Sequence, residues 1–524
     1  MKSLDNDILT SLAMLRRQTN PLQSPLYRFP SEVFSEIASH LQSKTDLVNL
    51  THVSYHLRTA LLSHPRLWSH IDSNHEERAR EFIERSARAP LRVNLVNHGS
   101  QNLSLLHSHR ARIVSLEMCD CVAQKKHIFS EPMPTLRRLK IIGCDHDDED
   151  GDNDGEPDLG PGGNPILSLP SVTLLIVHCV GSVLLHVPHL THFKFRETQS
   201  STTRIDPLLE FLDNCPLLED IDISYWSESP CSRDQLVSLP NLRTYRQAIR
   251  CGHYTLKLLN MLSLPPSCSV TSRCFSQPSS VGAAGTLPPF RHPDYLAGIT
   301  RIKLRTTLDT SRGRITGTLE LINAKGAKVC SERTVYVPPA EGDIRDELGL
   351  ELMRGLQGLD ARSAEILCLE GYSLWDGKGQ SVSIVADVLG YLQAAATLIL
   401  SGTTVKPCLL ALDLDPNAGG HLRRFPPVHT LIIHSDFQGT GDGPDTLQTL
   451  LVIAQRRKAA GFPLRSVSLF LLAGSGSEQI LEELRGCVER FEVAVGDGVL
   501  GWDVDRYFLD GLGHLRECRD VRWD

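Results

Sequence analysis

Three segments of this chain resemble metal- or nucleotide-binding motifs, but none of these motifs is clearly established. Residues 150–155 (DGDNDG) open like a calcium-binding EF-hand loop, but Pro161 stands at the twelfth position, where the loop requires a glutamate. The glycines of 439–441 follow an apolar run and precede a helical pattern, but the third glycine of a dinucleotide-binding turn is missing. The glycines of 474–476 also lie between an apolar run and a helical pattern, in the next unit of the chain. A solvated acidic loop and flexible turns explain these segments, so we predict no metal and no cofactor.

Twenty-one histidines and fourteen cysteines could supply nucleophiles or ligands, but their spacing favours neither role. The cysteines are scattered singly, Cys119 and Cys121 being the closest pair, and no CxxC or paired Cys/His spacing of a zinc site occurs. Histidines gather at 107–109 and 186–192, but no GxSxG, HExxH or P-loop motif accompanies them. We therefore predict reduced, buried thiols, no catalytic residues, and a protein that is not an enzyme.

The formal net charge of −8 comes from one segment. Residues 145–164 hold nine acidic residues and no Lys or Arg, and the remainder of the chain is balanced to within one charge. Such a body lacks the basic surplus that drives binding to nucleic acid, so we predict no nucleic-acid partner. The chain shows no signal-like N-terminal run and no stretch near the roughly 20 apolar residues of a membrane span. We expect no membrane association and a cytoplasmic and/or nuclear protein.

The first of the elements that must position any site is a short helix near the N-terminus. Leu4, Ile8, Leu12 and Leu15 recur at helical spacing, which predicts a short amphipathic helix over 4–18 that packs on the body.

Three more short helices are predicted between residues 26 and 71. Pro30 suits the first turn of the first helix, Asp46 can cap the second, Ser54 can cap the third, and Pro65 ends the pattern. The block carries more apolar side chains than so small a core can cover, which indicates a partner site unless the rest of the chain covers them. These side chains are Phe29, Val33, Phe34, Ile37, Leu41, Leu47, Val48, Leu50, Val53, Leu57, Leu61, Leu62, Leu67, Trp68 and Ile71.

The same block resembles the F-box. The resemblance rests, in order and at the family's spacing, on Phe29-Pro30-x-Glu32, Ile37, Leu41, Asp46-Leu47, Val53-Ser54, Arg58 and Pro65-x-Leu67-Trp68. Phe29 stands where the family more often has leucine, and both are large apolar residues. The resemblance implies that the block binds a Skp-type adaptor and, through it, a cullin. The adaptor-binding residues that it implies, without separating contact residues from supporting ones, are Phe29, Pro30, Glu32, Val33, Ile37, Leu41, Leu47, Leu50, Val53, Leu57, Leu67 and Trp68.

A second pattern, Pro-x-Leu-x-x-Leu-x-hydrophobic, recurs along the rest of the chain. It is typical of a leucine-rich repeat, in which a short strand alternates with a helical return and the units stack into a solenoid. Copies at irregular spacing begin near residues 111, 133, 169, 187, 215, 239, 363, 425 and 462, with helical returns at 206–215, 343–357 and 444–460. We therefore predict an α/β fold: a three-helix F-box followed by a divergent leucine-rich-repeat solenoid with a curved parallel sheet and outer helices.

The predicted boundaries follow from these patterns. They are an N-terminal helical lead at 1–24, an F-box at 25–72, a repeat array at 73–264 with the acidic insert 145–164, a linker at 265–297, and a second array at 298–524. Residues 298–340 alternate like antiparallel strands with turns at Arg312-Gly313 and Lys325-Gly326. This predicts a β-hairpin insertion or a junction between an N-terminal and a C-terminal half.

An F-box followed by a divergent repeat array resembles a large family of fungal F-box proteins. The resemblance implies a subunit of a Skp–cullin–F-box ubiquitin ligase that recruits an unknown protein substrate through its repeats. A scaffold that pairs with the Skp adaptor outside a cullin ligase is the alternative, and the sequence does not separate the two. A repeat-fold enzyme is disfavoured because no nucleophile, metal or phosphate-binding signature is present.

Overall fold

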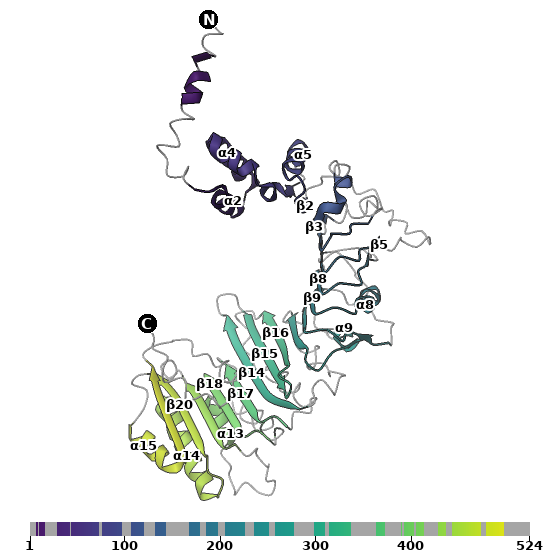
Figure 1. Cartoon of the computed structure of the whole chain (residues 1–524). Coiled ribbons are helices and arrows are strands. Elements are labelled where there is room, and N and C mark those ends of the chain that lie inside the picture. The colour runs from purple at the N-terminus through teal and green to yellow at the C-terminus, as the bar shows by residue number, and fades with distance from the viewer. Residues whose placement is uncertain are drawn as a thin grey trace. The chain divides into compact units, whose positions relative to one another are not determined.

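The computed structural model describes 22 segments of the chain, and it divides the chain into two compact units, residues 1–201 and 202–524 (Figure 1). The described residues are 7–8, 10–15, 29–41, 43–72, 76–96, 106–119, 132–142, 167–178, 185–196, 205–225, 235–250, 257–276, 298–309, 314–336, 363–371, 389, 392, 394–402, 405–412, 428–435, 443–472 and 478–496. The acidic insert 145–164, the glycine turns at 439–441 and 474–476, and the helix expected at 343–357 lie outside them.

The first unit opens with helices whose ends follow from the local sequence. They are α2 (Ser31–Ser39), α3 (Lys44–Val53), α4 (Tyr55–Leu62) and the 3₁₀ turn η2 (Pro65–Trp68). Pro30 precedes α2 as expected, and the Ser54 hydroxyl accepts a hydrogen bond from the Leu57 amide at 3.2 Å, which confirms the predicted cap of α4. The predicted cap of α3 was wrong. The Ser43 hydroxyl accepts from the Thr45 amide at 3.1 Å, and Asp46 lies inside the first turn.

The helix expected over 4–18 is present at residues 7–8 and 10–15, but its packing was predicted wrongly. Ile8, Leu12 and Leu15 are all exposed.

A parallel sheet follows directly from the helical head. Its order is β1 (His70–Asp72), β2 (Leu91–Leu95), β3 (Ile113–Cys119), β4 (Arg138–Ile142), β6 (Leu174–His178) and β8 (His192–Arg196). The helix α5 (Glu76–Arg85) connects β1 to β2, η4 (Arg110–Arg112) precedes β3, and β5 (Leu167–Ser168) pairs with β7 (Leu185–His186). Because Ile71 of β1 pairs with Val93 of β2, the end of the head is itself the first strand of the sheet.

The second unit contains a longer sheet with one antiparallel interruption. The strands β9 (Asp220–Tyr225), β11 (Thr244–Arg250) and β13 (Ser269–Ser276) are followed in space by β16 (Lys328–Tyr336), β15 (Arg314–Asn323) and β14 (Ile299–Asp309). The sheet then continues through β17 (Ile366–Gly371), β18 (Thr397–Gly402), β19 (Thr430–Ser435), β20 (Ser466–Leu472) and β21 (Arg490–Gly496).

Helices and a second small strand pair complete this unit. The helices are α8 (Ile205–Asp213), α9 (Lys257–Asn260), α13 (Val405–Leu412), α14 (Gly443–Ala459) and α15 (Glu478–Cys487), and β10 (Val237–Ser238) pairs with β12 (Leu262–Ser263). Two of them, α8 and α14, lie where helical returns were predicted. The helices α13, α14 and α15 lie along one face of the C-terminal strands (Figure 1).

The antiparallel strands expected at 298–340 are present, but they form part of the sheet. An odd number of antiparallel strands keeps the direction of the array, so β16 pairs in parallel with β13 and β14 pairs in parallel with β17. The predicted Lys325-Gly326 turn is confirmed. Gly326 has φ +79°, and the Asn323 side chain accepts from the amides of Lys325 and Ala327, each at 3.0 Å.

The linker expected at 265–297 was wrong over its first part. The strand β13 occupies Ser269–Ser276 and pairs on both sides. Two residues of this strand, Val270 and the small hydroxyl residue Ser272, are buried. Serine and threonine suit a strand between two neighbours, although their composition resembles that of a loop.

The two sheets differ in how their faces are covered. In the first unit, burial alternates along β2, β4, β6 and β8, so one face is packed and the other is open. In the second unit, successive residues of β18 such as Leu398, Ile399 and Leu400 are all buried. A side chain cluster of Ile322, Cys368, Ile399 and Ile432 covers the face of β15 and β17–β19 opposite the leucines.

Candidate functional site

The structure separates the predicted head residues into outer and inner groups. The exposed ones are Phe29, Pro30, Glu32, Val33, Ile37 and Val53. The half-buried ones are Leu41 and Leu50, and the buried ones are Leu47, Leu57, Leu67 and Trp68. The buried group can support a binding surface but cannot touch a partner without rearrangement. The sequence pattern did not contain this division.

The core of the head forms where α2, α3 and α4 meet. Phe34 from α2 is buried and meets two other rings edge-on, with centroids 6.2 Å from Phe29 and 5.7 Å from His56. Leu61, which was not among the predicted site residues, is fully buried in α4. Edge-to-face ring pairs contribute about 0.5–1.5 kcal/mol beyond the burial of their area, so Phe34 fixes the position of α2.

Trp68 joins the head to the first helix of the sheet. It is fully buried, and its indole N–H donates to the Leu61 carbonyl at 3.0 Å. The Phe82 ring of α5 meets it edge-on at 5.1 Å, and the Arg85 guanidinium lies 4.7 Å from its ring centroid. Trp68 is therefore held from both sides, by α4 and by α5.

The outer surface of the head carries large apolar side chains. Phe29 is 44% exposed, Ile37 52%, Val53 69% and Tyr55 61%. Val33 and Ile37 are one helical turn apart, so they lie on the same side of α2. Tyr55 was missed by the sequence analysis. Tyr55 directly follows the cap residue of α4. Its position in the first turn of a short helix could have indicated an exposed aromatic residue.

Charged groups contribute little to this surface. The exposed side chains of Glu36 in α2 and His40 at its C-cap lie 3.3 Å apart, and Glu32 is exposed in the first turn. Solvent-exposed pairs of this kind contribute about 0.2–1 kcal/mol. The head is therefore suited to apolar contact with a partner.

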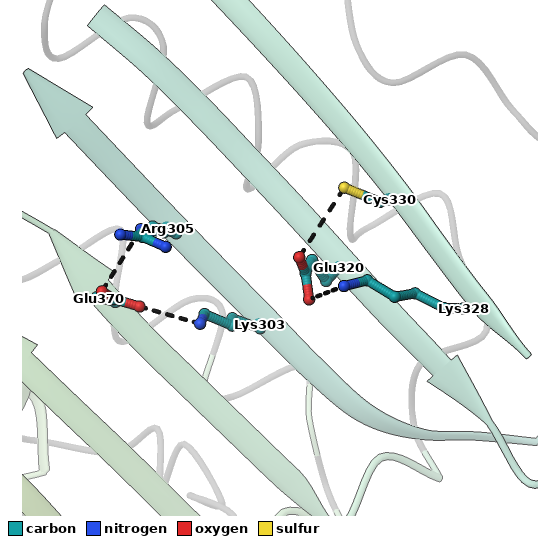
Figure 2. A network of polar contacts seen from close by, with 6 residues as sticks. All are labelled: Lys303, Arg305, Glu320, Lys328, Cys330 and Glu370. Atoms are coloured by element: carbon teal, nitrogen blue, oxygen red, sulfur yellow. Dashed lines mark hydrogen bonds and ion pairs between the residues drawn. The ribbon is translucent and has the colours of Figure 1, made fainter. Parts of the chain in front are cut away.

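A cluster of polar side chains lies on the second sheet (Figure 2). Lys303 on β14 is fully buried and pairs with Glu370 on β17 at 3.1 Å, and Arg305 approaches the same carboxylate at 3.5 Å. Next to them, Lys328 on β16 pairs with Glu320 on β15 at 2.9 Å (Figure 2). Each carboxylate has a basic partner within the sheet, so the cluster holds strands together.

The chemistry of a nucleophile is disfavoured at Cys330, which borders this cluster. Burial and, next, the neighbouring Glu320 carboxylate, 4.0 Å from the sulfur, together raise the pKa of its thiol to about 11. At neutral pH the thiol therefore stays protonated and weakly nucleophilic. Among the residues that the structure describes, no three His, Cys, Asp or Glu side chains gather closely enough to hold a metal ion.

Comparison with known families identifies the head. Residues 26–74 match the family model described as F-box-like, which covers α2, α3, α4, η2 and β1. The chain thus carries an F-box-like domain at its N-terminal end, and F-box domains generally bind Skp-type adaptors. No curated protein matches the chain significantly. Within the described part of the chain, no helix has both the length and the apolar character needed to cross a membrane.

Proposed function

We propose that this protein is a substrate-recruiting subunit of a Skp–cullin–F-box ubiquitin ligase. The F-box-like head would bind a Skp-type adaptor, the adaptor would connect it to a cullin, and the two sheet units would hold a protein substrate. The chain itself would be no enzyme. Its contribution to ubiquitin transfer would be to bring the substrate near the charged ubiquitin-conjugating enzyme, which raises the rate through proximity. Such a protein would act in the cytoplasm or the nucleus.

The observation that carries the proposal is the exposure of Phe29, Val33, Ile37 and Val53 on a head with an F-box-like sequence. Soluble proteins rarely leave several large apolar side chains outside a small domain unless a partner covers them. The core beneath is already complete, because Phe34, Leu61 and Trp68 are buried. The side chains of Val33, Ile37 and Val53 are therefore available for an interface, and the exposed Phe29 lies beside them in edge-on contact with Phe34.

The connection between head and sheet supports the recruiting role. A substrate receptor must hold its substrate at a defined place relative to the adaptor, because a loose connection would lower the effective concentration of the reacting groups. Trp68 is packed against α5, and β1 pairs with β2, so no linker separates the head from the first sheet.

We further propose that the strand-forming units are divergent leucine-rich repeats of the kind found in fungal F-box proteins. Strands occupy the end of every predicted copy of the pattern, for example β4 after Pro134 and β20 after Pro463. Neighbouring strands are parallel, as repeat stacking requires. The antiparallel strands β14–β16 depart from a regular array.

The experiment that tests the adaptor site uses a matched pair of variants. Phe29→Ala with Pro30→Ala removes two exposed residues at the start of α2, and we expect it to abolish co-purification of the Skp-type adaptor. Pro216→Ala with Leu217→Ala makes a comparable change at an exposed turn before β9 and should leave co-purification intact. Unchanged adaptor recovery with the first variant would contradict the assignment of the interface.

The ligase role requires a second measurement on the same purified complexes. We expect cullin to be recovered together with the adaptor and the wild-type chain, and to be lost with the Phe29→Ala, Pro30→Ala variant. Recovery of the adaptor without any cullin would contradict the ligase role, while leaving the adaptor site in place.

A further inference from the structure

The open face of the first sheet presents side chains in ordered rows. Strand register places His70, Arg92, Ser115, Arg138, Leu174 and His192 in one row across β1–β8. The next row is Asp72, Asn94, Glu117, Lys140, Ile176 and Lys194, and His178 and Arg196 continue beyond it. These residues are exposed or half-buried, and they alternate with buried residues along β2, β4, β6 and β8. We name this surface the basic face.

The basic face carries a surplus of positive charge. Five of its side chains are Lys or Arg and two are acidic. One of the two acids, Glu117, already pairs with Lys140 at 2.6 Å. The surplus acts on the imidazole of His178, whose pKa is lowered first by burial and then by Arg196, Lys140 and Lys194. The charges therefore combine into one positive field over β4, β6 and β8.

On the second sheet, most cations lie close to a carboxylate of a neighbouring strand. Arg273 pairs with Glu332 at 3.2 Å, Lys328 with Glu320 at 2.9 Å, and Lys303 with Glu370 at 3.1 Å, so cations and carboxylates alternate from strand to strand. Beyond β17 the equivalent positions become buried and apolar. Carboxylates therefore compensate a larger share of the cations on the second sheet than on the basic face.

We propose that the basic face binds an acidic segment of a partner polypeptide. Among the side chains that this segment turns toward the face, carboxylates flank an apolar one. The cations lie on both sides of an apolar strip formed by Ile142, Leu174 and Ile176. Every second side chain of an extended peptide points to the same face. A peptide that crosses β4, β6 and β8 can therefore place carboxylates over the cations of β4 and β8 and an apolar side chain over the strip between them. In the context of the proposed function, on which this one point rests, the polypeptide would be the ligase substrate.

Several features of the basic face favour polypeptide over nucleic acid. The apolar strip has no counterpart in a phosphate backbone, and Asp72 and Glu117 would repel phosphates. Proteins that bind single strands stack bases on aromatic side chains, but the outward residues described on β1–β8 include no Phe, Tyr or Trp. The phenylalanines of β8, Phe193 and Phe195, are buried on the other side.

The test measures binding of a labelled peptide to the purified full chain. The peptide repeats Glu-Ser-Leu-Ser, so its glutamates and leucines point to the same side when it is extended. Six strands at about 4.8 Å spacing span about 24 Å, which about eight extended residues can cross. The triple variant Arg138→Gln, Lys194→Gln, Arg196→Gln removes three cations of the basic face. The control triple Arg80→Gln, Arg243→Gln, Arg485→Gln changes net charge equally at exposed sites elsewhere.

We expect the basic-face triple to weaken peptide binding at least about tenfold and the control triple to change it by less than about twofold. Binding of the wild-type chain should also weaken as salt is raised. Equal weakening by the two triples would overturn the proposal, because net charge alone would then explain it. Tighter binding of a single-stranded oligonucleotide of equal charge would overturn it in favour of nucleic acid.

Two further outcomes separate this proposal from others. Peptide binding that appears only after the acidic residues of 145–164 are changed to Asn and Gln would overturn it, since the chain itself would then occupy the face. Adaptor co-purification is measured on the same proteins and should be unaffected by the triple. Its absence from every protein would contradict the proposed function while peptide binding could still stand.

Discussion

The rings of Trp68 and Phe82 meet edge-on with their centroids 5.1 Å apart. Trp68 is the last residue of η2 and Phe82 lies in α5, so this contact joins the F-box-like head to the first helix of the sheet. The indole also donates to the Leu61 carbonyl, which fixes its ring plane. One buried side chain thus completes the core of the head and sets the position of the head on the first unit.

Replacement of Trp68 should therefore destabilise the head far more than replacement of an exposed aromatic residue. We expect Trp68→Ala to lower the free energy of unfolding by about 3–5 kcal/mol, because it leaves a large cavity and removes the indole hydrogen bond to the Leu61 carbonyl. Tyr55→Ala, at a 61% exposed position, should cost less than about 1 kcal/mol. Hydrogen exchange of the α4 amides measures both, and equal protection in the two variants would contradict this role of Trp68.

Charges placed on the outer surface should separate binding from stability. We expect Ile37→Glu with Val53→Glu to weaken adaptor binding by about a hundredfold or more, because two glutamates would be buried without partners. Both positions are exposed in the free chain, so its melting temperature should hardly change. The control is Phe462→Glu, a 66% exposed residue of the second unit. Full adaptor affinity in the double variant would place the interface elsewhere.

The two candidate caps of α3 can be distinguished directly. We expect Ser43→Ala to cost about 1 kcal/mol, because the Thr45 amide loses its acceptor. Asp46→Asn should cost only about 0.3–1 kcal/mol, since it removes a favourable charge from the first turn without removing a cap. Chemical denaturation of both variants provides the comparison. A larger effect at Asp46 would restore the cap that the sequence suggested.

The buried pair of Lys303 and Glu370 should show the asymmetry of a desolvated ion pair. We expect Lys303→Met to cost about 3 kcal/mol, because Glu370 keeps only the longer contact to Arg305. Adding Glu370→Leu should recover much of the loss, since an apolar pair fits this site without a desolvation cost. Urea denaturation of the single and double variants measures the coupling. Additive losses in the double variant would show that the two side chains do not depend on each other.

Burial of His434 should make the second unit sensitive to acid. The imidazole stacks on Phe470 with centroids 4.3 Å apart, and burial lowers its pKa from 6.5 to about 4. Because the folded pKa is lower, the unfolded chain binds the proton first, so stability is full above pH 6.5 and falls until about pH 4. We expect a loss of about 2 kcal/mol between pH 7 and pH 5.

The control for this pH dependence is the variant His434→Asn, which cannot take up the proton. Urea denaturation at both pH values should show a smaller loss in the variant than in the wild-type chain. An identical loss in both proteins would assign the acid sensitivity to other groups, such as His178, whose pKa burial also lowers.

Local patterns in the sequence predicted much of the secondary structure. Pro30 and Ser54 marked the starts of α2 and α4 because their effects reach only the next turn. The repeated Leu-x-hydrophobic stretches became strands such as β3, β9 and β19, because alternation along a strand is also local.

Features set by distant neighbours could not be predicted in this way. The sequence placed several apolar residues in α2 but did not show that Phe34 would face the core while Ile37 faces outward. Ser272 lies in a strand only because β11 and β16 flank it, far away in sequence. Likewise, Lys303 is buried because β14 lies between β15 and β17, an order that no local pattern contains.

The most direct measurement is calorimetric titration of a purified Skp-type adaptor into the purified full chain. We expect one adaptor to bind each chain with a negative heat-capacity change, because Phe29, Val33, Ile37 and Val53 would leave water on binding. The Ile37→Glu, Val53→Glu variant should give no measurable binding under the same conditions. Absence of binding to the wild-type chain, or equal binding by the variant, would contradict the central claim that this head is an adaptor-docking module.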